Sequence, residues 1–177
     1  MSNKVIKNLT ITAMLAAVSM VLVFIGFSIF PQVEFLKYDP ADVPIMILSF
    51  MLGPVYGVAC SLIVAIFQAI FWSADGIVGC IMNILSTCAF IVPASMIYRK
   101  NKTKSTAVIG LVIGCIIMTI IMLLFNYFIT PVYRGIPRQA IIPLLPWIGG
   151  FNIIKASINS VLTFLLYKHI GKIIKRF

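Results

Sequence analysis

The segment from Pro146 to Tyr167 reads PWIGGFNIIKASINSVLTFLLY, and it is long and apolar enough to be a transmembrane helix. Its one charged residue is Lys155, and an ammonium near the middle of a span costs roughly 2.5–3.5 kcal/mol on insertion scales. Asn152 lies three positions earlier, on the same helical face, and offers a donor and an acceptor. We therefore expect Asn152 and Lys155 to form one wall of a polar pocket. The alternative is that Lys155 extends its ammonium to the membrane interface, or bonds backbone carbonyls near Gly149 and Gly150.

The chain as a whole has the composition of an integral membrane protein. Its 177 residues are 62% hydrophobic and 10% charged, and the mean hydropathy is +1.12, whereas about 25% of residues in soluble domains are charged. The net charge of +10 does not indicate nucleic-acid binding, because the basic residues lie between apolar runs, as the positive-inside rule predicts. We expect a single domain over residues 1–177 that spans the bacterial cytoplasmic membrane several times.

Uncharged runs predict where the helices lie, at residues 8–33, 43–74, 76–98, 105–133 and the segment already quoted. The second run is longer than the ~20 residues that one span needs, and Gly53-Pro54 interrupts it where a tight turn would divide it. Six spans place the three basic clusters on one side of the membrane, whereas five spans would move the middle cluster across. We therefore expect an all-α bundle of six transmembrane helices with both termini in the cytoplasm. All four acids then lie outside: Glu34, Asp39, Asp42 and Asp75.

The outer loop at residues 31–42 is expected to fold back over the bundle as a lid, because Leu36 and Tyr38 are unusual as solvent-exposed residues. Asp39 comes before Pro40, and Asp42 comes before Val43-Pro44. An aspartate at either position suits the N-terminus of a helix that has proline in its first turn. We expect helix capping to account for both aspartates.

Several kinds of chemistry lack the residues that they require. The sequence has no Gly-x-x-x-x-Gly-Lys-Ser/Thr loop, so we expect no ATP hydrolysis by this chain alone. The single histidine, His169, and four cysteines without a Cys-x-x-Cys pair indicate no metal site. No nucleophile and base stand out as a pair, so we expect no catalytic residue, no enzyme activity and no cofactor. An ion-coupled carrier usually needs a carboxylate within its spans, and every acid is assigned to the outer side.

The predicted spans hold one lysine and several amides. Amides also join helices to one another, and this interpretation suits Gln68, Asn83 and Asn159. Asn126 enters and Asn152 leaves the same outer loop, so both are expected in the outer half of the bundle. Amides, one lysine and many aromatic rings suit a neutral, planar, heteroaromatic ligand with carbonyls and ring nitrogens.

The sequence resembles the substrate-binding S components of energy-coupling factor (ECF) vitamin transporters, and their riboflavin-specific members most closely. The resemblance covers nearly the whole chain and implies six helices that bind one vitamin near the outer face, beneath the loop between helices one and two. The motifs that carry it are Leu36-Lys37-Tyr38-Asp39-Pro40-Ala41-Asp42-Val43-Pro44 with Gly53-Pro54 after it, residues 79–93 with Asn83, and Phe151-Asn152-Ile153-Ile154-Lys155 followed by Ile158-Asn159-Ser160.

This resemblance implies roles for individual residues. Asn152 and Lys155 would hydrogen-bond the carbonyls and ring nitrogens of the isoalloxazine ring. Asn126 would add a polar contact, and Leu36 would close the lid. Secondary candidates for ligand contact are Tyr38, Gln68 and Asn83. Helix three departs from the family pattern, because Gln68 and Phe71-Trp72 stand where many relatives carry a lysine and a histidine. This difference could shift the preference among riboflavin, its phosphate FMN and a related flavin, and the alternative function is an S component for another vitamin.

Transport would depend on partner proteins, since the chain has neither an ATP site nor a carboxylate placed for ion coupling. Ala13 and Ala17 share one face of the first predicted helix, and small residues at this spacing let another helix approach closely. The resemblance implies that this face docks on the transmembrane T component, which joins two cytoplasmic ATPases. The alternatives are that these alanines pack within the bundle, or that the protein is a small integral membrane enzyme or a scaffold.

Overall fold

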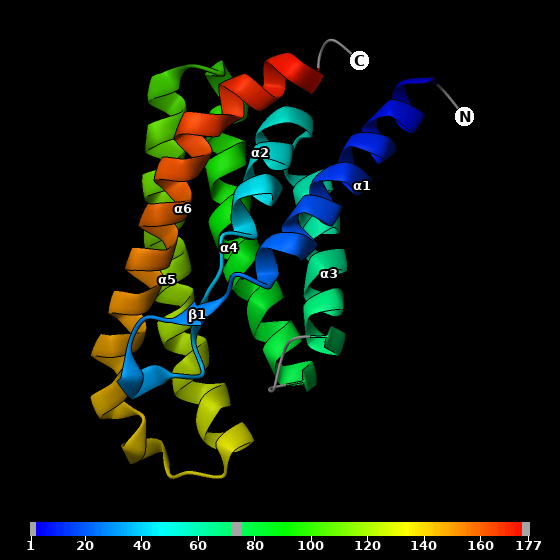
Figure 1. Cartoon of the computed structure of the whole chain (residues 1–177). Helices are drawn as coiled ribbons and strands as arrows, with labels where there is room; N and C mark the ends of the chain where they lie inside the picture. The colour runs from blue at the N-terminus through cyan, green and yellow to red at the C-terminus, as the bar shows by residue number, and fades with distance from the viewer. Residues whose placement is uncertain (1–2, 72–75, 175–177) are drawn as a thin grey trace.

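The computed structural model describes residues 3–71 and 76–174, which form a bundle of six helices with a small hairpin against it (Figure 1). In chain order the elements are α1 (Asn3–Val23), β1 (Phe27–Ser28), η1 (Pro31–Val33), β2 (Lys37–Tyr38), α2 (Asp42–Leu52), α3 (Pro54–Phe71), α4 (Gly76–Asn101), α5 (Lys104–Arg134), η2 (Arg138–Ala140), η3 (Ile142–Leu144) and α6 (Leu145–Ile174). Trp72 and Asp75, which entered the sequence predictions, lie outside the described residues.

The predicted division of the second apolar run is confirmed. α2 ends at Leu52, Gly53 follows with a φ of 108° that favours glycine, and Pro54 begins α3. The first apolar run is shorter as a helix than expected, because α1 ends at Val23 and the chain then turns into strand β1. No charged residue marks this end of the helix, because residues 24–33, which follow it, are also uncharged.

α2 is short and lies at the centre of the bundle, in contact with α1, α3, α4 and α6. Every residue from Asp42 to Phe50 is buried, so almost none of this helix reaches lipid. Eleven residues rise only about 16 Å, which is less than the ~30 Å hydrocarbon core. The helices long and apolar enough to cross a membrane within the described residues are the other five: α1, α3, α4, α5 and the segment that contains α6. The protein is therefore a multi-pass membrane protein whose central helix is enclosed by its neighbours.

α4 and α5 approach each other closely because glycines line their contact. A Cβ at Gly110 would lie 2.6 Å from the Ala94 carbonyl oxygen, and one at Gly114 would lie 2.5 Å from the Phe90 carbonyl oxygen. Real Cβ atoms do not approach backbone oxygens this closely, so any side chain here would push the helices apart. Small residues that allow backbones to meet are typical of helix packing in membranes.

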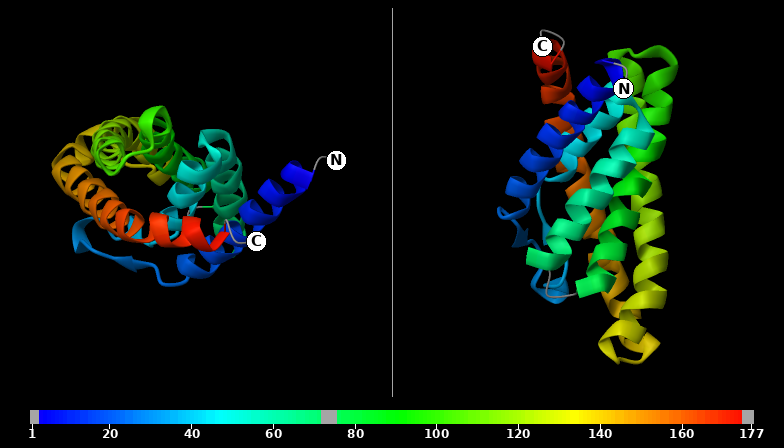
Figure 2. Two further views of the ribbon diagram at one scale, coloured as in Figure 1. Left: turned by 90° about the horizontal axis from the view of Figure 1, so that it is seen from above. Right: turned by 90° about the vertical axis from the view of Figure 1, so that its right-hand side faces the viewer.

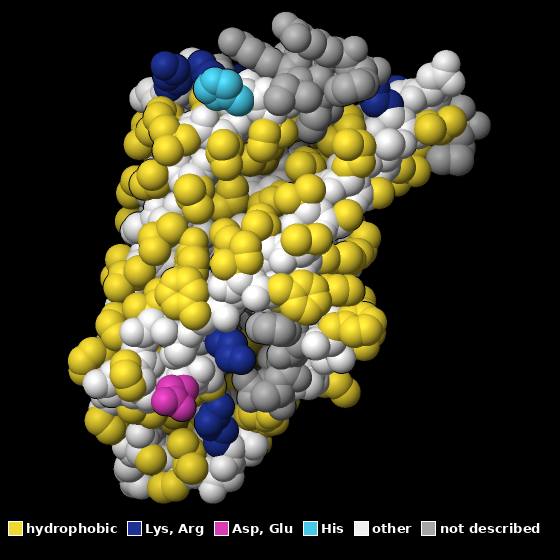
Figure 3. Space-filling model, viewed as in Figure 1, with side chains coloured by type: hydrophobic (Ala, Val, Ile, Leu, Met, Phe, Trp, Pro, Cys, Tyr) yellow, Lys and Arg dark blue, Asp and Glu magenta, His cyan; other side chains and the backbone are white. Residues whose placement is uncertain are grey.

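The two ends of the bundle differ in what they carry (Figure 2). The start of α1, the end of α6 and the connection between α4 and α5 lie at one end, whereas the hairpin and the connection between α5 and α6 lie at the other. Apolar side chains cover the middle of the face in Figure 3, and charged side chains lie toward both ends. This arrangement agrees with the predicted topology, and the cytoplasmic side of the termini stays a prediction.

A cysteine-labelling experiment tests that orientation. Lys102 lies in the connection between α4 and α5, at the same end as the start of α1. In a background without the native cysteines, a cysteine at Lys102 should react with a membrane-impermeant thiol reagent only after the membrane is opened. Cysteines at Ser2 and Phe177, which lie outside the described residues, should behave in the same way. Labelling of Lys102→Cys in sealed, right-side-out cells would contradict the six-span topology.

Residues 24–41, here called the lid, fold back over the bundle as the sequence predicts. β1 and β2 pair antiparallel, and the segment between them contacts both α5 and α6. The ring of Phe30 lies 5.4 Å from that of Trp147 in α6, and the guanidinium of Arg134 in α5 lies 4.3 Å from the centre of the Phe35 ring. Two aromatic contacts therefore hold the lid against the last two helices.

Candidate ligand-binding site

A cavity of about 370 Å³ lies beneath the lid, and its lining comes from the lid and from α3, α4, α5 and α6. This volume is in the range of about 300–1,000 Å³ that is typical of small-molecule sites. Most of the side chains predicted to bind a ligand line it: Leu36, Gln68, Asn83, Asn126, Asn152 and Lys155. The fold thus gathers into one cavity residues that are more than a hundred positions apart in the sequence.

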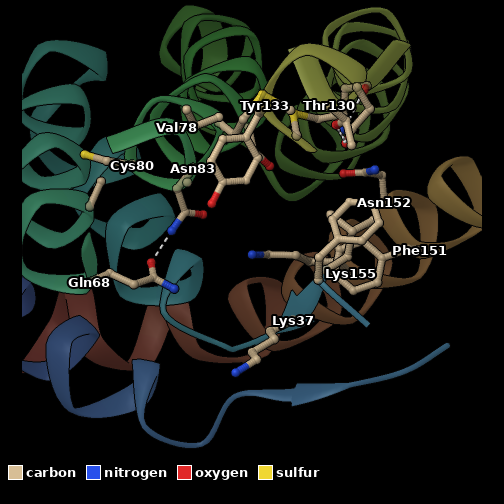
Figure 4. Close-up of a pocket in the computed structure, with 18 of the residues that line it drawn as sticks. Lys37, Gln68, Val78, Cys80, Asn83, Thr130, Tyr133, Phe151, Asn152 and Lys155 are labelled. Carbon is tan, nitrogen blue, oxygen red and sulfur yellow. Dashed lines mark hydrogen bonds between the residues drawn. The ribbon is translucent and has the colours of Figure 1, made fainter. Parts of the chain in front are cut away.

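Asn126 and Asn152 lie on facing helices at one side of this cavity. The Asn126 amide donates to the Met122 carbonyl at 2.8 Å and accepts a hydrogen bond from Thr130 at 3.0 Å. The Asn152 amide donates to the Ile148 carbonyl at 2.8 Å. Figure 4 shows the Asn152 side chain and the Lys155 ammonium directed toward the same open space. The Asn126 and Asn152 amides each donate to a backbone carbonyl of their own helix, so the positions of both side chains are set before any ligand enters.

Lys155 is paired with two buried aspartates, which the sequence analysis did not predict. Its Nζ atom lies 3.6 Å from Oδ2 of Asp39 and 3.5 Å from Oδ2 of Asp42, and all three side chains are at least 94% buried. These three residues are here called the Lys155 cluster. The two carboxylates neutralise the ammonium inside the bundle, so Lys155 has no need to reach the membrane interface. The alternative, in which Lys155 extends to the interface or bonds backbone carbonyls near Gly149 and Gly150, is therefore wrong.

Two of the acids assigned to the outer side, Asp39 and Asp42, are buried inside the bundle and do not face solvent. Asp42 is the first residue of α2 and is buried between α4 and α6. Its Oδ1 accepts a hydrogen bond from Thr87 at 2.7 Å, and its Oδ2 accepts one from the Asn159 amide at 3.3 Å. Both oxygens of the Asp42 carboxylate therefore have partners, with Lys155 also beside Oδ2. This satisfies the usual requirement for a buried charge.

Helix capping accounts for neither aspartate. The residue at the N-cap of α2 is Ala41, which makes no side-chain capping bond. Asp39 Oδ1 accepts a hydrogen bond from the Ala41 backbone at 3.1 Å, which is a turn contact two residues along the chain. Burial raises the pKa of the Asp39 carboxyl above its usual value, and the nearby Lys155 ammonium opposes this shift. The one sequence signal related to the cluster is that two acids precede one apolar run and a lysine lies inside another, and this signal does not pair them.

Tyr38 lies behind the cavity and not in its lining. Its hydroxyl donates to Oδ1 of Asn159 at 3.3 Å, and its ring lies 5.4 Å from that of Phe27 across the hairpin. Asn159 therefore joins the lid to α2, because its amide nitrogen also donates to Asp42. The interpretation of Asn159 as an amide that joins parts of the fold is therefore supported. Tyr38 contacts Asn159 and does not form part of the cavity wall.

Gln68 and Asn83 face the cavity from the side opposite α6, as Figure 4 shows. Their side chains hydrogen-bond each other, with the Asn83 amide nitrogen donating to the Gln68 amide oxygen. Both interpretations made from the sequence are therefore compatible with their position, since the pair joins α3 to α4 and also lines the cavity. Leu36, from the lid, closes another part of the wall.

Ala13 and Ala17 lie far from this cavity, on the exposed face of α1. Their neighbours Thr12, Leu15 and Ala16 turn inward and are buried. The two alanines therefore do not pack within the bundle of this chain.

A lidded cavity toward one end of a membrane bundle, lined by amides and one buried lysine, defines a membrane-embedded binding protein for a small solute. The family model for the substrate-specific component of ECF transporters matches residues 7–167. This chain belongs to that family.

Relatives agree with this assignment over nearly the full length. The riboflavin transporter RibU of Staphylococcus aureus is 33% identical, covering 96% of this chain and 93% of its own length. The riboflavin transporter FmnP of Bacillus subtilis is 28% identical, covering 92% of this chain and 90% of its own. A solved structure described as the S component of a bacterial ECF transporter is 32% identical, with a TM-score of 0.84 over 96% of this chain and 98% of that one.

Proposed function

We propose that this chain is the high-affinity riboflavin-binding S component of an ECF transporter for vitamin uptake in the bacterial cell membrane. The observation that carries the proposal is the cavity wall where Asn126, Asn152 and Lys155 meet beneath the lid. The relatives named as riboflavin transporters align with this chain over more than nine tenths of its length. Both lines of argument point to the same ligand.

The chemistry of this wall suits the isoalloxazine ring. Amide and ammonium donors bind ring carbonyls and nitrogens, while amide oxygens accept from the ring imide N–H. Phe151 and Tyr133 also line the cavity and offer aromatic surface to a flat ring. The Lys155 cluster holds two carboxylates beside its ammonium, so the charge of Lys155 is already compensated and the wall favours a neutral ring over an anionic group.

Transport in this proposal requires a T component and two cytoplasmic ATPase subunits, which supply the energy. The exposed face of α1 that carries Ala13 and Ala17 is the proposed contact with the T component, because small side chains let a second helix approach closely. The chain itself acts as the solute receptor, without enzyme activity or a resident cofactor.

Purification from a flavin-containing host tests the ligand. The protein should retain about one flavin per chain, visible as yellow absorbance, and the purified apo protein should quench riboflavin fluorescence on titration. Asn152→Ala should weaken binding by up to roughly a hundredfold, since losing a hydrogen bond to a buried partner costs about 1–3 kcal/mol. Asn8→Ala removes an amide that contacts Tyr56 far from the cavity and serves as the control. A wild type with no flavin affinity would point to another vitamin.

FMN is the second candidate ligand, because Lys37 and Arg134 line the same cavity and bring positive charge that suits a phosphate. Titrations with riboflavin and FMN at two salt concentrations distinguish the two. Tighter binding of FMN that weakens with salt would favour the phosphorylated flavin.

A further inference from the structure

The Lys155 cluster contains one carboxylate more than its charge balance needs. Asp42 alone neutralises Lys155, and its other hydrogen bonds come from Thr87 and Asn159. A second buried carboxylate adds a desolvation cost of several kcal/mol without being needed to neutralise the lysine. Asp39 therefore calls for an explanation beyond stability.

The two aspartates occupy different kinds of position. Asp42 belongs to the enclosed helix α2 and does not line the main cavity, whereas Asp39 belongs to the lid and lines that cavity beside Lys155. The distances of 3.5 and 3.6 Å show that the ammonium lies about equally far from the two carboxylates. Both exceed the about 2.7–2.9 Å of a short charge-assisted hydrogen bond. An ammonium has three donors, so it can still donate to a ligand from this position.

We propose that Asp39 is a positioning residue for ligand binding, which draws the Lys155 ammonium away from Asp42 and toward the cavity. This inference rests on the proposed function, since it concerns the lysine expected to contact the flavin ring. Without the Asp39 charge, the ammonium would turn to Asp42 and shorten that ion pair. The lysine would stay neutralised and buried, yet it would present its donors less well to the ligand.

The first test is a double-mutant cycle with Asp39→Asn and Lys155→Met, read as riboflavin affinity and dissociation rate. Asp39→Asn should weaken binding about tenfold, mainly through faster dissociation, while the unfolding temperature of the apo protein stays near that of the wild type. In the Lys155→Met background, Asp39→Asn should cause no further loss. A further tenfold loss there would overturn the proposal, because Asp39 would then act on the ligand without Lys155. Asp42→Asn is the contrast, and it should lower the unfolding temperature because the amide keeps one acceptor oxygen, so either Thr87 or Asn159 loses its partner.

The second test is the pH profile of riboflavin binding, which keeps the proposal testable if Lys155→Met does not fold. The positioning requires ionised Asp39, whose pKa burial raises, so wild-type affinity should fall once the pH is low enough for this carboxyl to take up a proton. Asp39→Asn should be weaker but flat as the pH falls. The ionisable groups around Asp39 are Lys155, Asp42 and Tyr38, together with cavity residues Glu34, Lys37, Cys80, Tyr133 and Arg134, whereas Gln68, Asn83 and Thr87 are uncharged.

The outcomes separate this inference from the proposed function. If the wild type binds riboflavin tightly and Asp39→Asn has the same affinity and the same pH profile, Asp39 has no positioning role and the proposed function stands. If the wild type binds no flavin at any pH, the proposed function fails first. Both the proposed function and the positioning role are supported if Asp39→Asn lowers riboflavin affinity tenfold with a flat pH profile. The same substitution must then have no effect in the Lys155→Met background.

Discussion

Replacing Lys155 with alanine should strongly weaken flavin binding and destabilise the protein at the same time. The ligand would lose its cationic donor, and affinity should fall by at least about a hundredfold. Asp39 and Asp42 would remain buried without their ammonium, and breaking a buried ion pair costs about 3–5 kcal/mol. For a chain of this size that loss corresponds to a fall of roughly 6–20 °C in unfolding temperature. Fluorescence titration and thermal unfolding in detergent measure the two effects separately.

A compensating variant separates the two roles of Lys155. Lys155→Ala combined with Asp42→Asn removes one of the stranded carboxylates and should recover part of the unfolding temperature. It should not recover flavin affinity, because the donor in the cavity is still missing. If the double variant regained both stability and binding, the lysine would be only a counter-ion and the ligand role proposed for it would be wrong.

Tryptophan at Ala13 or Ala17 should abolish ATP-dependent flavin uptake while leaving flavin binding nearly unchanged. Both alanines lie on the exposed face of α1, far from the cavity, so bulk there blocks a partner helix without entering the binding site. Uptake is measured in cells or vesicles that contain the complete transporter, and binding is measured on the purified chain.

Two controls define this result. Ala17→Ser keeps the face small and should transport normally. Ile116→Trp places the same bulk on an exposed position of α5, which has no proposed partner, and should also transport. Loss of ligand binding in Ala13→Trp or Ala17→Trp, or uptake equal to the wild type, would contradict the docking assignment.

Features with a local cause could be predicted from the sequence. Gly53-Pro54 ends one helix and begins the next through backbone preferences that two adjacent residues express by themselves. The lid could be predicted because Tyr38 is an aromatic residue that is unusual in an exposed loop, and Tyr38 is buried in the structure. Asn126 and Asn152 come together because they flank one connection, which makes their distance in space short.

Features with a long-range cause could not be predicted. The partners of Lys155 lie near the start of α2, and no local spacing connects them to α6. The sequence supported capping equally well for Asp39 and Asp42, because both precede a helix that contains proline. Tyr38 is a secondary candidate for ligand contact from the sequence, whereas its hydroxyl reaches Asn159, 121 positions away. Only the packing of α2 in the middle of the bundle decides between these possibilities.

The enclosed position of α2 also has a consequence for biosynthesis. Asp42 is made early, and its hydrogen-bond donor Asn159 follows 117 positions later, close behind Lys155. At about 5–20 residues per second, a ribosome takes roughly 6–23 s to cover that stretch. During this interval the nascent chain holds an acidic residue at the start of an apolar helix with no cation to match it. Completion of the core therefore waits for the last helix, which brings Lys155 and Asn159 to Asp42.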